Sequence, residues 1–472
     1  MKTLMRTVLI TGAVVLALAA VYGMLLLSPA PRETQEILFT DMEPVDIASV
    51  TVENATGTYS FYYQDDGYVL DDIPGTIVDL DAFIAFMTNC GQLKALRQVA
   101  DAPLARYGLQ TPSSTVDLVF FSEKTLRLTL GDQEKISGNY YVAVEGFPGV
   151  YLMEKSLAEP FLRSKTQMIT RLVTPALALS SPLSAIRDIT FTGGPLEEPV
   201  TIQATSGGDE ETRLAALSFG TATHLVRSTG VYQLDQTYGV EVLGSLFGIP
   251  SREIAGYNLS EEEISQLGFN KPWMKVECDM VNGLDTQPEH VVLLVTRLGE
   301  DDFYATRAGS SVVYRIGRQP FMDIRYDRLL LRWFLTPMLM DVSSVTVKGD
   351  GRQYRFEVDQ TDRKNPVITY EGTKLDVQLF RSLFRLLTSA AHDGVYLGRQ
   401  QEPASGNLLT ITYEYTDPGK ATDVLSLYPG GVRRANVFVN GIGEFAMKDQ
   451  FIDRVWEGCE HLITGQPVEE NW

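Results

Sequence analysis

The chain repeats itself at long intervals, and this repetition restricts its fold more than any other feature does. The stretches that begin at Asp46 and Asp341 share one alternation of apolar and polar side chains, and a looser copy begins at Ala185. Such alternation predicts a half-buried β-strand at the start of each copy. The sequence therefore predicts three tandem units, at residues 46–178, 185–338 and 341–464, followed by a tail at 465–472.

A helix is expected after the opening strands of the first and third copies. Asp79 and Asp376 stand where they can cap its first turn. The middle copy shows only a weak version of this pattern, over residues 242–247. Apolar residues at i, i+3, i+4 and i+7 predict a face that packs on a sheet. These residues are Leu80, Phe83, Ile84 and Met87 in the first copy, and Phe380, Leu383, Phe384 and Leu387 in the third.

A Gly-x-x-x-Pro pattern follows in the first two copies and leads at equal distance into a strand. A glycine at this position predicts a helix C-cap with positive φ. The third copy lacks the pattern and is assigned from the order of its elements. The repeat motif residues are Tyr107, Gly108, Leu109, Pro112, Gly131, Tyr141 and Tyr151 in the first copy, and Gly268, Phe269, Pro272, Gly299, Tyr304 and Tyr314 in the second.

Strands joined by short turns, with one or two helices per unit, predict an α+β fold. Each unit should be an antiparallel sheet with one or two packed helices. The apolar connector at residues 329–340 is expected to lie buried between the second and third units. A binding surface is the alternative interpretation of such an apolar segment.

The N-terminal region predicts a transmembrane helix ahead of these units. Residues 7–27 carry no charge and are long enough to cross the hydrocarbon core of a bilayer. Lys2 and Arg6 precede this run and acidic residues follow it, so residues 1–6 should be cytoplasmic and the bulk of the chain extracytoplasmic. Residues 28–45 would be a linker. A cleaved signal peptide is the rival hypothesis, although Pro31 would follow the cleavage site and hinder the peptidase.

Composition opposes several classes of function. A formal net charge of -20 opposes binding to nucleic acid, whose partners concentrate Lys and Arg. Cys90, Cys278 and Cys459 lie far apart, so a disulfide framework and a zinc site are not expected. No cofactor is predicted.

The first copy resembles an uncharacterised bacterial family, the domain of unknown function family 4340. The resemblance lies in Tyr107-Gly108-Leu109-x-x-Pro112, in the turn at residues 128–131 and in the strands at residues 140–152, with a weaker match at 267–314. It implies a membrane anchor followed by repeated units, with no known enzymatic activity and no catalytic residues to transfer. Members are often encoded near components of gliding-motility-type ABC transporters, which implies an accessory role there.

No catalytic motif supports a particular enzyme. The four histidines form neither HxH nor HExxH, and neither GxSxG nor a Walker loop occurs. Cys278 with His290 remains a nucleophile–base pair that sequence distance leaves open, although a strand cysteine is typical of a core. Acidic runs, such as residues 300–302, predict solvated turns rather than calcium loops.

Three functional hypotheses follow from these observations. The first is a non-enzymatic accessory or scaffold subunit of an envelope complex, such as a gliding-motility-type ABC transporter or another envelope protein assembly. The alternative is a module that binds an envelope ligand, either a cell-wall polymer or a small molecule. The third, an envelope hydrolase with an unfamiliar site, requires catalytic residues that no motif identifies.

Overall fold

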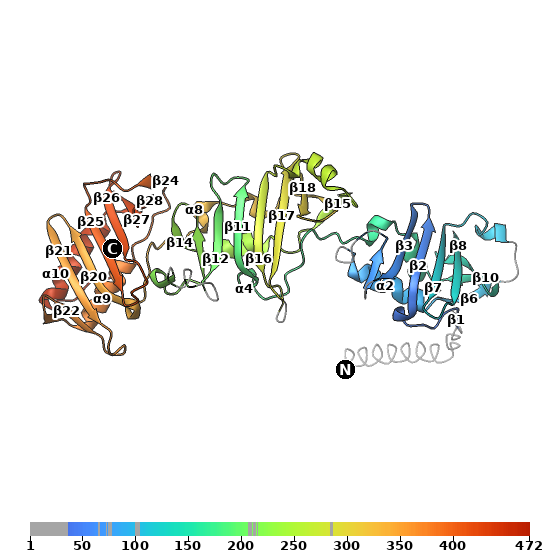
Figure 1. The fold of residues 1–472 in the computed structure, drawn as a ribbon, viewed down its shortest axis with the longest axis horizontal. Helices are drawn as coiled ribbons and strands as arrows, with labels where there is room; N and C mark the ends of the chain where they lie inside the picture. The colour runs from blue at the N-terminus through green and yellow to red at the C-terminus, as the bar shows by residue number, and fades with distance from the viewer. Residues whose placement is uncertain are drawn as a thin grey trace, which may run out of the picture. The chain divides into compact units, whose positions relative to one another are not determined.

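The computed structural model describes residues 36–64, 67–71, 73, 78–99, 104–205, 210, 214, 216–283 and 287–472. The chain divides into two compact units, of which the first ends at Thr170 and the second runs from Arg171 to Trp472 (Figure 1). The predicted anchor at residues 7–27 lies outside the described residues. Within the described ranges, no helix is both long and apolar enough to span a membrane.

Three large antiparallel sheets share one strand order. The first sheet contains β4 (Gly67–Leu70), β3 (Gly57–Gln64), β2 (Ile47–Asn54), β7 (Ser114–Phe120), β8 (Thr125–Gln133), β9 (Tyr140–Val144), β10 (Phe147–Met153) and β6 (Arg97–Val99) in spatial order. A separate small sheet pairs β1 (Ile37–Leu38) with β5 (Lys94–Ala95).

The other two sheets lie in the second compact unit and repeat this order with one more edge strand. The second sheet contains β14 (Val231–Gln233), β13 (His224–Arg227), β12 (Val200–Ala204), β11 (Ile186–Gly193), β16 (Met274–Met280), β17 (Glu289–Arg297), β18 (Phe303–Arg307), β19 (Val313–Ile316) and β15 (Ser251–Gly256). The third contains β23 (Thr373–Lys374), β22 (Val367–Tyr370), β21 (Arg352–Asp359), β20 (Val342–Gly349), β25 (Leu409–Tyr415), β26 (Asp423–Pro429), β27 (Arg434–Val439), β28 (Ile442–Lys448) and β24 (Tyr396–Gln401). The predicted α+β class with repeated antiparallel units is confirmed.

The two central strands of each sheet slip in register at the same place. The shift follows Ile47 on β2, Ile186 on β11 and Val342 on β20, which are the aligned first residues of the three opening strands. A register shift changes which side chains face the core, so its position is a specific structural feature. The third sheet shares this shift as well as the strand order, although its sequence lacks the Gly-x-x-x-Pro pattern.

One longer helix accompanies the strands of each sheet, and an aspartate caps each of the three. In α2 (Leu80–Gly91) and α9 (Val377–Thr388), the caps are the predicted Asp79 and Asp376. In α6 (Gln236–Gly244), Asp235 accepts a hydrogen bond from the backbone N–H of Tyr238 at 3.0 Å, a cap that the sequence analysis missed.

The predicted apolar face is confirmed in α9 and partly wrong in α2. All four predicted residues of α9 are buried. In α2, Met87 is buried, but Leu80 and Ile84 are 66% and 53% exposed. Phe86 is fully buried, and the rings of Phe83 and Phe86 lie 5.0 Å and 5.4 Å from that of Phe61. The inward face of α2 is therefore turned toward Phe86 and away from Leu80 and Ile84.

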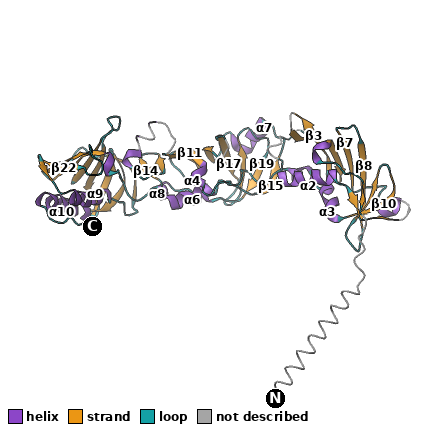
Figure 2. Cartoon of the chain, turned by 90° about the horizontal axis from the view of Figure 1, so that it is seen from below, coloured by secondary structure: helices purple, strands orange, loops and turns teal. Residues whose placement is uncertain are grey.

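The third sheet has a second long helix, α10 (Gln450–Thr464), which lies beside α9 on the same face (Figure 2). The helices approach closely at Gly458, where a Cβ atom would lie 3.1 Å from Leu383 and 3.2 Å from Leu386. The other helices in the described ranges are short: η1 (Pro44–Asp46), η3 (Leu104–Tyr107), α3 (Lys155–Ala158), η4 (Glu159–Leu162), η5 (Lys165–Met168), α4 (Pro182–Ala185), η6 (Ala216–Ser218), α7 (Glu261–Ile264), η7 (Ser265–Phe269), η8 (Pro320–Asp323), α8 (Tyr326–Leu329) and η9 (Leu339–Asp341).

Each sheet buries one face, and around its two central strands the other face is polar. Along β7, the side chains of Val116 and Leu118 are buried, whereas Thr115 and Asp117 between them are only half-buried. Asp117 forms an ion pair with Arg127 of β8 at 2.6 Å on that open face. One covered and one solvated face is typical of antiparallel sheets.

The connector at residues 329–340 lies between the second and third sheets, as predicted. The backbone of Leu330 forms a β-bridge with Leu234, which follows β14 of the second sheet. The backbone of Trp333 forms another with Ala391, which lies between α9 and β24 in the third repeat. Phe334 and Leu335 are buried, but Trp333, Met338 and Met340 are exposed, so the expected burial of the connector is confirmed only in part. The connector therefore joins the two sheets of the second compact unit by backbone pairing.

Candidate functional site

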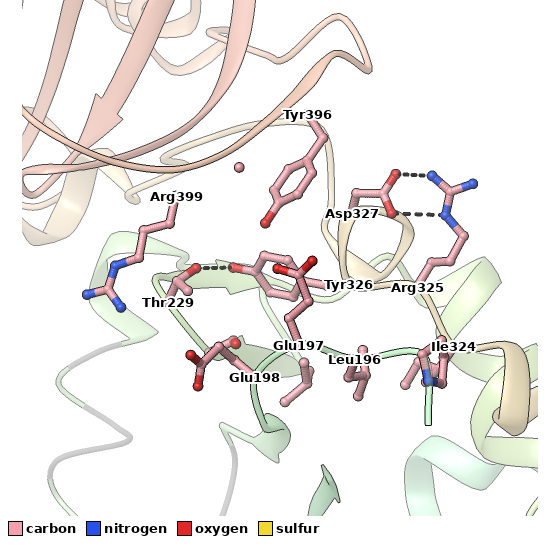
Figure 3. A pocket seen from close by; sticks show the side chains of 14 residues that line it. Leu196, Glu197, Glu198, Thr229, Ile324, Arg325, Tyr326, Asp327, Tyr396 and Arg399 are labelled. Carbon is pink, nitrogen blue, oxygen red and sulfur yellow. Dashed lines mark hydrogen bonds and ion pairs between the residues drawn. The ribbon is translucent and has the colours of Figure 1, made fainter. Parts of the chain in front are cut away.

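A cavity of about 500 Å³ lies in the second compact unit, where the second and third sheets meet (Figure 3). Its volume falls within the usual range of small-molecule sites. Its walls come from four separate stretches of chain. They are formed by Pro195, Leu196, Glu197, Glu198, Val200, Ser228, Thr229, Ile324, Arg325, Tyr326, Asp327, Tyr396, Gly398 and Arg399.

Local backbone geometry brings these stretches together. Gly193 and Gly194 have φ values of +80° and +63°, which turn the chain out of β11 into the loop that carries Glu197 and Glu198. Gly398 has φ +72° inside β24, between Tyr396 and Arg399. These conformations favour glycine, and they place charged and aromatic side chains at the mouth of the cavity.

A buried carboxylate, that of Glu444 on β28, lies behind this wall. Glu444 is 1% exposed and accepts a hydrogen bond from the Tyr326 hydroxyl at 2.9 Å and another from the Thr229 hydroxyl. Burial raises the pKa of Glu444, while hydrogen bonds from Tyr232 and Tyr326 act in the opposite direction. Because Tyr326 and Thr229 belong to the second repeat, this carboxylate ties the third sheet to the cavity wall.

Two tyrosine rings face the cavity. Tyr396 is 42% exposed, and its ring lies 6.1 Å from Tyr326 and 5.3 Å from Phe445. Burial raises the pKa of Tyr396, and the neighbouring carboxylates of Glu444, Glu197 and Asp327 raise it further. In Figure 3, Tyr396 and Glu197 extend toward Tyr326 from opposite sides. The site therefore combines exposed aromatic surface with nearby acceptors.

The cavity wall carries charges of both signs. Arg325 and Asp327 form an ion pair at 2.6 Å. Arg399, Glu197 and Glu198 make no ion pair with another residue in the part of the chain that the structure describes. Their polar atoms are thus available to hydrogen-bond a ligand.

A second buried carboxylate, that of Asp423, joins the same two sheets outside the cavity. Asp423 accepts hydrogen bonds from the hydroxyls of Tyr415 at 2.6 Å and of Ser218, and its other oxygen accepts from the Asn440 amide at 2.8 Å. Ser218 belongs to the second repeat and the other three residues to the third. Buried carboxylates are tolerated when donors of this kind satisfy their oxygens.

The predicted motif residues of the first copy meet one another in the first compact unit. Gly108 has φ +72°, as predicted, and a Cβ atom there would lie 2.4 Å from a carboxylate oxygen of Asp132. A Cβ atom on Gly131 would lie 2.1 Å from the carbonyl oxygen of Tyr107, whose ring is 4.5 Å from that of Tyr141. Leu109 and Tyr151 are buried, and Pro112 precedes β7. The motif thus docks a turn onto β8.

The second copy keeps part of this arrangement. Gly268 has φ +94°, Phe269 and Tyr314 are buried, Tyr304 lies on β18, and Pro272 precedes β16. None of the motif residues lines the cavity of about 500 Å³. Phe269 instead lines a cavity of about 370 Å³ beside α7 and η7.

Strand register aligns Gly131 with Thr296 rather than with Gly299. Leu130 pairs with Ser114, the first residue of β7, and Val295 pairs with Met274, the first residue of β16. A Cβ atom on Gly268 would accordingly lie 3.2 Å from the Thr296 side chain. Gly299 lies in the following turn, where its N–H donates to Asp302.

Cys278 and His290 do not form a pair. Cys278 is opposite Val291 in the β16–β17 ladder, and His290 is opposite Asp279, so the two side chains point to opposite faces. His290 contacts the Asp279 carboxylate at 2.6 Å on the exposed face, whereas burial raises the pKa of the Cys278 thiol to about 12. A thiol held protonated in this way is a poor nucleophile.

The acidic turn at residues 300–302 is held by arginines. Asp302 pairs with Arg315 at 2.6 Å, and hydrogen bonding to Arg315 lowers the pKa of Asp302. Asp301 pairs with Arg318 at 3.1 Å. Across the described ranges, no group of three or more potential ligands from His, Cys, Asp and Glu could hold a metal ion.

Residues 75–228 match the model of a family described as Domain of unknown function (DUF4340). The match confirms the resemblance of the first copy and covers about a third of the chain. The weaker resemblance at residues 267–314 lies outside it. No curated protein and no solved structure matches the chain.

Proposed function

We propose, from the family match and the geometry of the sheets, that this chain is a non-enzymatic accessory or scaffold subunit of an envelope complex. Residues 7–27 would anchor it in the membrane, with residues 1–6 in the cytoplasm and the bulk of the chain outside it. A gliding-motility-type ABC transporter is the complex that the family resemblance implies.

The observation that carries this proposal is the polar open face around the central strands of each of the three sheets. On the third sheet, Arg355 lies between Glu357, at 2.6 Å, and Glu414, at 2.7 Å. On the first sheet, the hydroxyls of Thr51 and Ser60 lie 2.8 Å apart. Broad faces of half-buried threonines and paired charges suit a polar protein–protein contact, which resembles the ordinary protein surface in its polarity.

The test is co-purification of the full chain from native membranes, with a C-terminal tag at its normal expression level. We expect transporter subunits, or another envelope protein, in stoichiometric amount. The variant Arg355→Gln should reduce their recovery, because it removes a positive charge from the open face of the third sheet, beside central strand β20. Arg454→Gln is the control, since Arg454 lies on α10 and pairs with Glu457 at 2.7 Å.

Recovery of the tagged chain alone, in a detergent that keeps a known envelope complex intact, would reject the accessory function. Equal loss of partners in both arginine variants would instead reject the open face of the third sheet as the contact surface.

The second candidate is a module that binds an envelope ligand, and the cavity between the second and third sheets favours it. Two tyrosines and several unpaired charged groups converge there, as is common in ligand sites. The purified full chain should then sediment with isolated cell-wall sacculi in the absence of any membrane protein. Failure to sediment over a range of salt concentrations would exclude the cell-wall polymer as the ligand.

A further inference from the structure

The cavity beside Tyr396 has a rigid wall. The Glu444 carboxylate holds the Tyr326 hydroxyl at 2.9 Å and also accepts from Thr229. On the other side, Tyr396 packs its ring against Phe445 at 5.3 Å. Side chains that are already fixed lose little conformational entropy when a ligand binds, so such a wall is preorganised.

The exposed part of Tyr396 is a flat apolar surface with polar groups at its edge. Tyrosine offers large, rigid, amphipathic contact area at low entropic cost. Arg399 directly follows Gly398 on β24, and Glu197 and Glu198 lie on the loop across the cavity. A ligand with an apolar face and polar edges would therefore contact ring and charged groups together.

The charges of the cavity favour a ligand that both donates and accepts hydrogen bonds. Carboxylates accept, and the guanidinium of Arg399 donates from a planar fork. The wall holds the carboxylates of Glu197, Glu198 and Asp327 and the guanidiniums of Arg325 and Arg399. Carboxylates outnumber guanidiniums by one, so an anionic ligand would be disfavoured. A cationic ligand would be repelled by the two guanidiniums, so the cavity favours neither sign of charge.

We propose that this cavity binds a neutral sugar ring of an envelope polysaccharide, with one face of the ring on Tyr396 and its hydroxyls on Arg399 and Glu197. A pyranose ring presents C–H groups on its faces and hydroxyls around its edge, which matches the distribution of apolar and polar groups here. The inference rests on the second candidate function, binding of an envelope ligand.

The test is a titration of the full chain with soluble neutral oligosaccharides, namely the tetramer of N-acetylglucosamine and cellotetraose, followed by calorimetry and ligand-observed NMR. Tetramethylammonium and citrate serve as charged comparison ligands. We expect saturable binding of at least one oligosaccharide. Tyr396→Ala should weaken it by about tenfold or more, as truncation of a central aromatic contact usually does.

Two further variants make the result specific. Arg399→Gln should weaken binding without abolishing it, because the aromatic face remains. Tyr63→Ala is the matched control, because Tyr63 has nearly the same exposure, 43% against 42% for Tyr396, and lies in the first compact unit. Its affinity should equal that of the wild type. Melting temperatures of all variants verify that each is folded.

Three outcomes would overturn the inference: no saturable binding of either oligosaccharide, equal affinity in the Tyr396→Ala and Tyr63→Ala variants, or binding of tetramethylammonium alone. Sedimentation with sacculi separates this failure from failure of the second candidate function. If wild type and Tyr396→Ala sediment equally, ligand binding stands and its assignment to this cavity falls. If neither sediments but oligosaccharide binding depends on Tyr396, the cavity assignment stands and the cell-wall polymer is excluded.

Discussion

Replacing Tyr326 by Phe removes one oxygen atom from the contact between the second and third sheets. The lost hydroxyl donates to the Glu444 carboxylate at 2.9 Å, and Glu444 is almost completely buried. A hydrogen bond to a charged group contributes about 1.5–3 kcal/mol to stability. Tyr326 also borders the cavity, where water can replace part of the lost bond, so we expect a cost near the lower end, about 1.5 kcal/mol.

The cost should depend on pH in a defined direction. Burial raises the pKa of Glu444, so this carboxyl contributes stability below its unfolded pKa and loses that contribution as the pH rises through its folded pKa. The Tyr326 hydroxyl opposes the loss by stabilising the ionised form. Tyr326→Phe should therefore cost more at pH 8 than at pH 5, because a rising pH favours the ionised carboxyl, which gains more from a donor.

The assay is urea unfolding of wild type, Tyr326→Phe, Glu444→Gln and the double variant at both pH values. The double-mutant cycle should give a coupling energy of about 1–2 kcal/mol at pH 8, within the usual range for residues in contact. Tyr63→Phe in the first compact unit is the control and should change stability by less than about 0.5 kcal/mol. Equal costs of Tyr326→Phe at the two pH values, or a coupling energy near zero, would refute this account of the buried carboxylate.

Four further predictions concern the fold. Gly108→Ala should lower the stability of the first unit by more than about 1 kcal/mol, because φ is +72° and the new Cβ would meet Asp132, whereas Gly67→Ala, with open space around it, should be nearly neutral in thermal unfolding. Leu80→Ser should cost less than about 0.5 kcal/mol in urea unfolding and Phe86→Ala about 3–5 kcal/mol, and similar costs would contradict the orientation of α2. Asp235→Ala should cost about 0.5–2 kcal/mol through the lost cap of α6, and an unchanged urea midpoint would mean that the cap contributes nothing. Cys90, Cys278 and Cys459 should resist alkylation at pH 8 in the native chain and react fully in urea, since all three are buried and burial raises the pKa of each thiol.

Helical spacing predicted the elements more reliably than it predicted their orientation. In α9 the spacing and the buried face agree, and Leu386 is buried beside the four predicted residues. In α2 the same helical spacing also fits Phe86 and Cys90, which are buried, so the spacing alone leaves two overlapping faces open. Asp235 was missed because α6 has few large apolar residues to mark its start.

The cavity could not be predicted from the sequence, because residues that line it, such as Thr229 and Tyr396, are more than a hundred residues apart in the chain. Glu444 gave one indirect signal, as an acidic residue inside an otherwise apolar strand. Alternation would have placed it on a solvated face. β28 is instead buried on both faces, because the connector and the second repeat cover it. The alternation of buried and exposed residues that a half-buried strand shows is therefore absent from β28.

The shared strand order also sets the order of events while the chain is being made. In the centre of each sheet, the opening strand pairs with a strand that is synthesised only after the intervening helix. In the third sheet, the Ser344 hydroxyl on β20 donates a hydrogen bond to the Glu414 carboxylate on β25, which is synthesised 70 residues later. At about 5–20 residues per second, that strand edge stays unpaired for several seconds. Non-local pairing of this kind folds slowly and exposes apolar edges. If the chain is exported as proposed, three such sheets would make it depend on chaperones until their central strand pairs have formed.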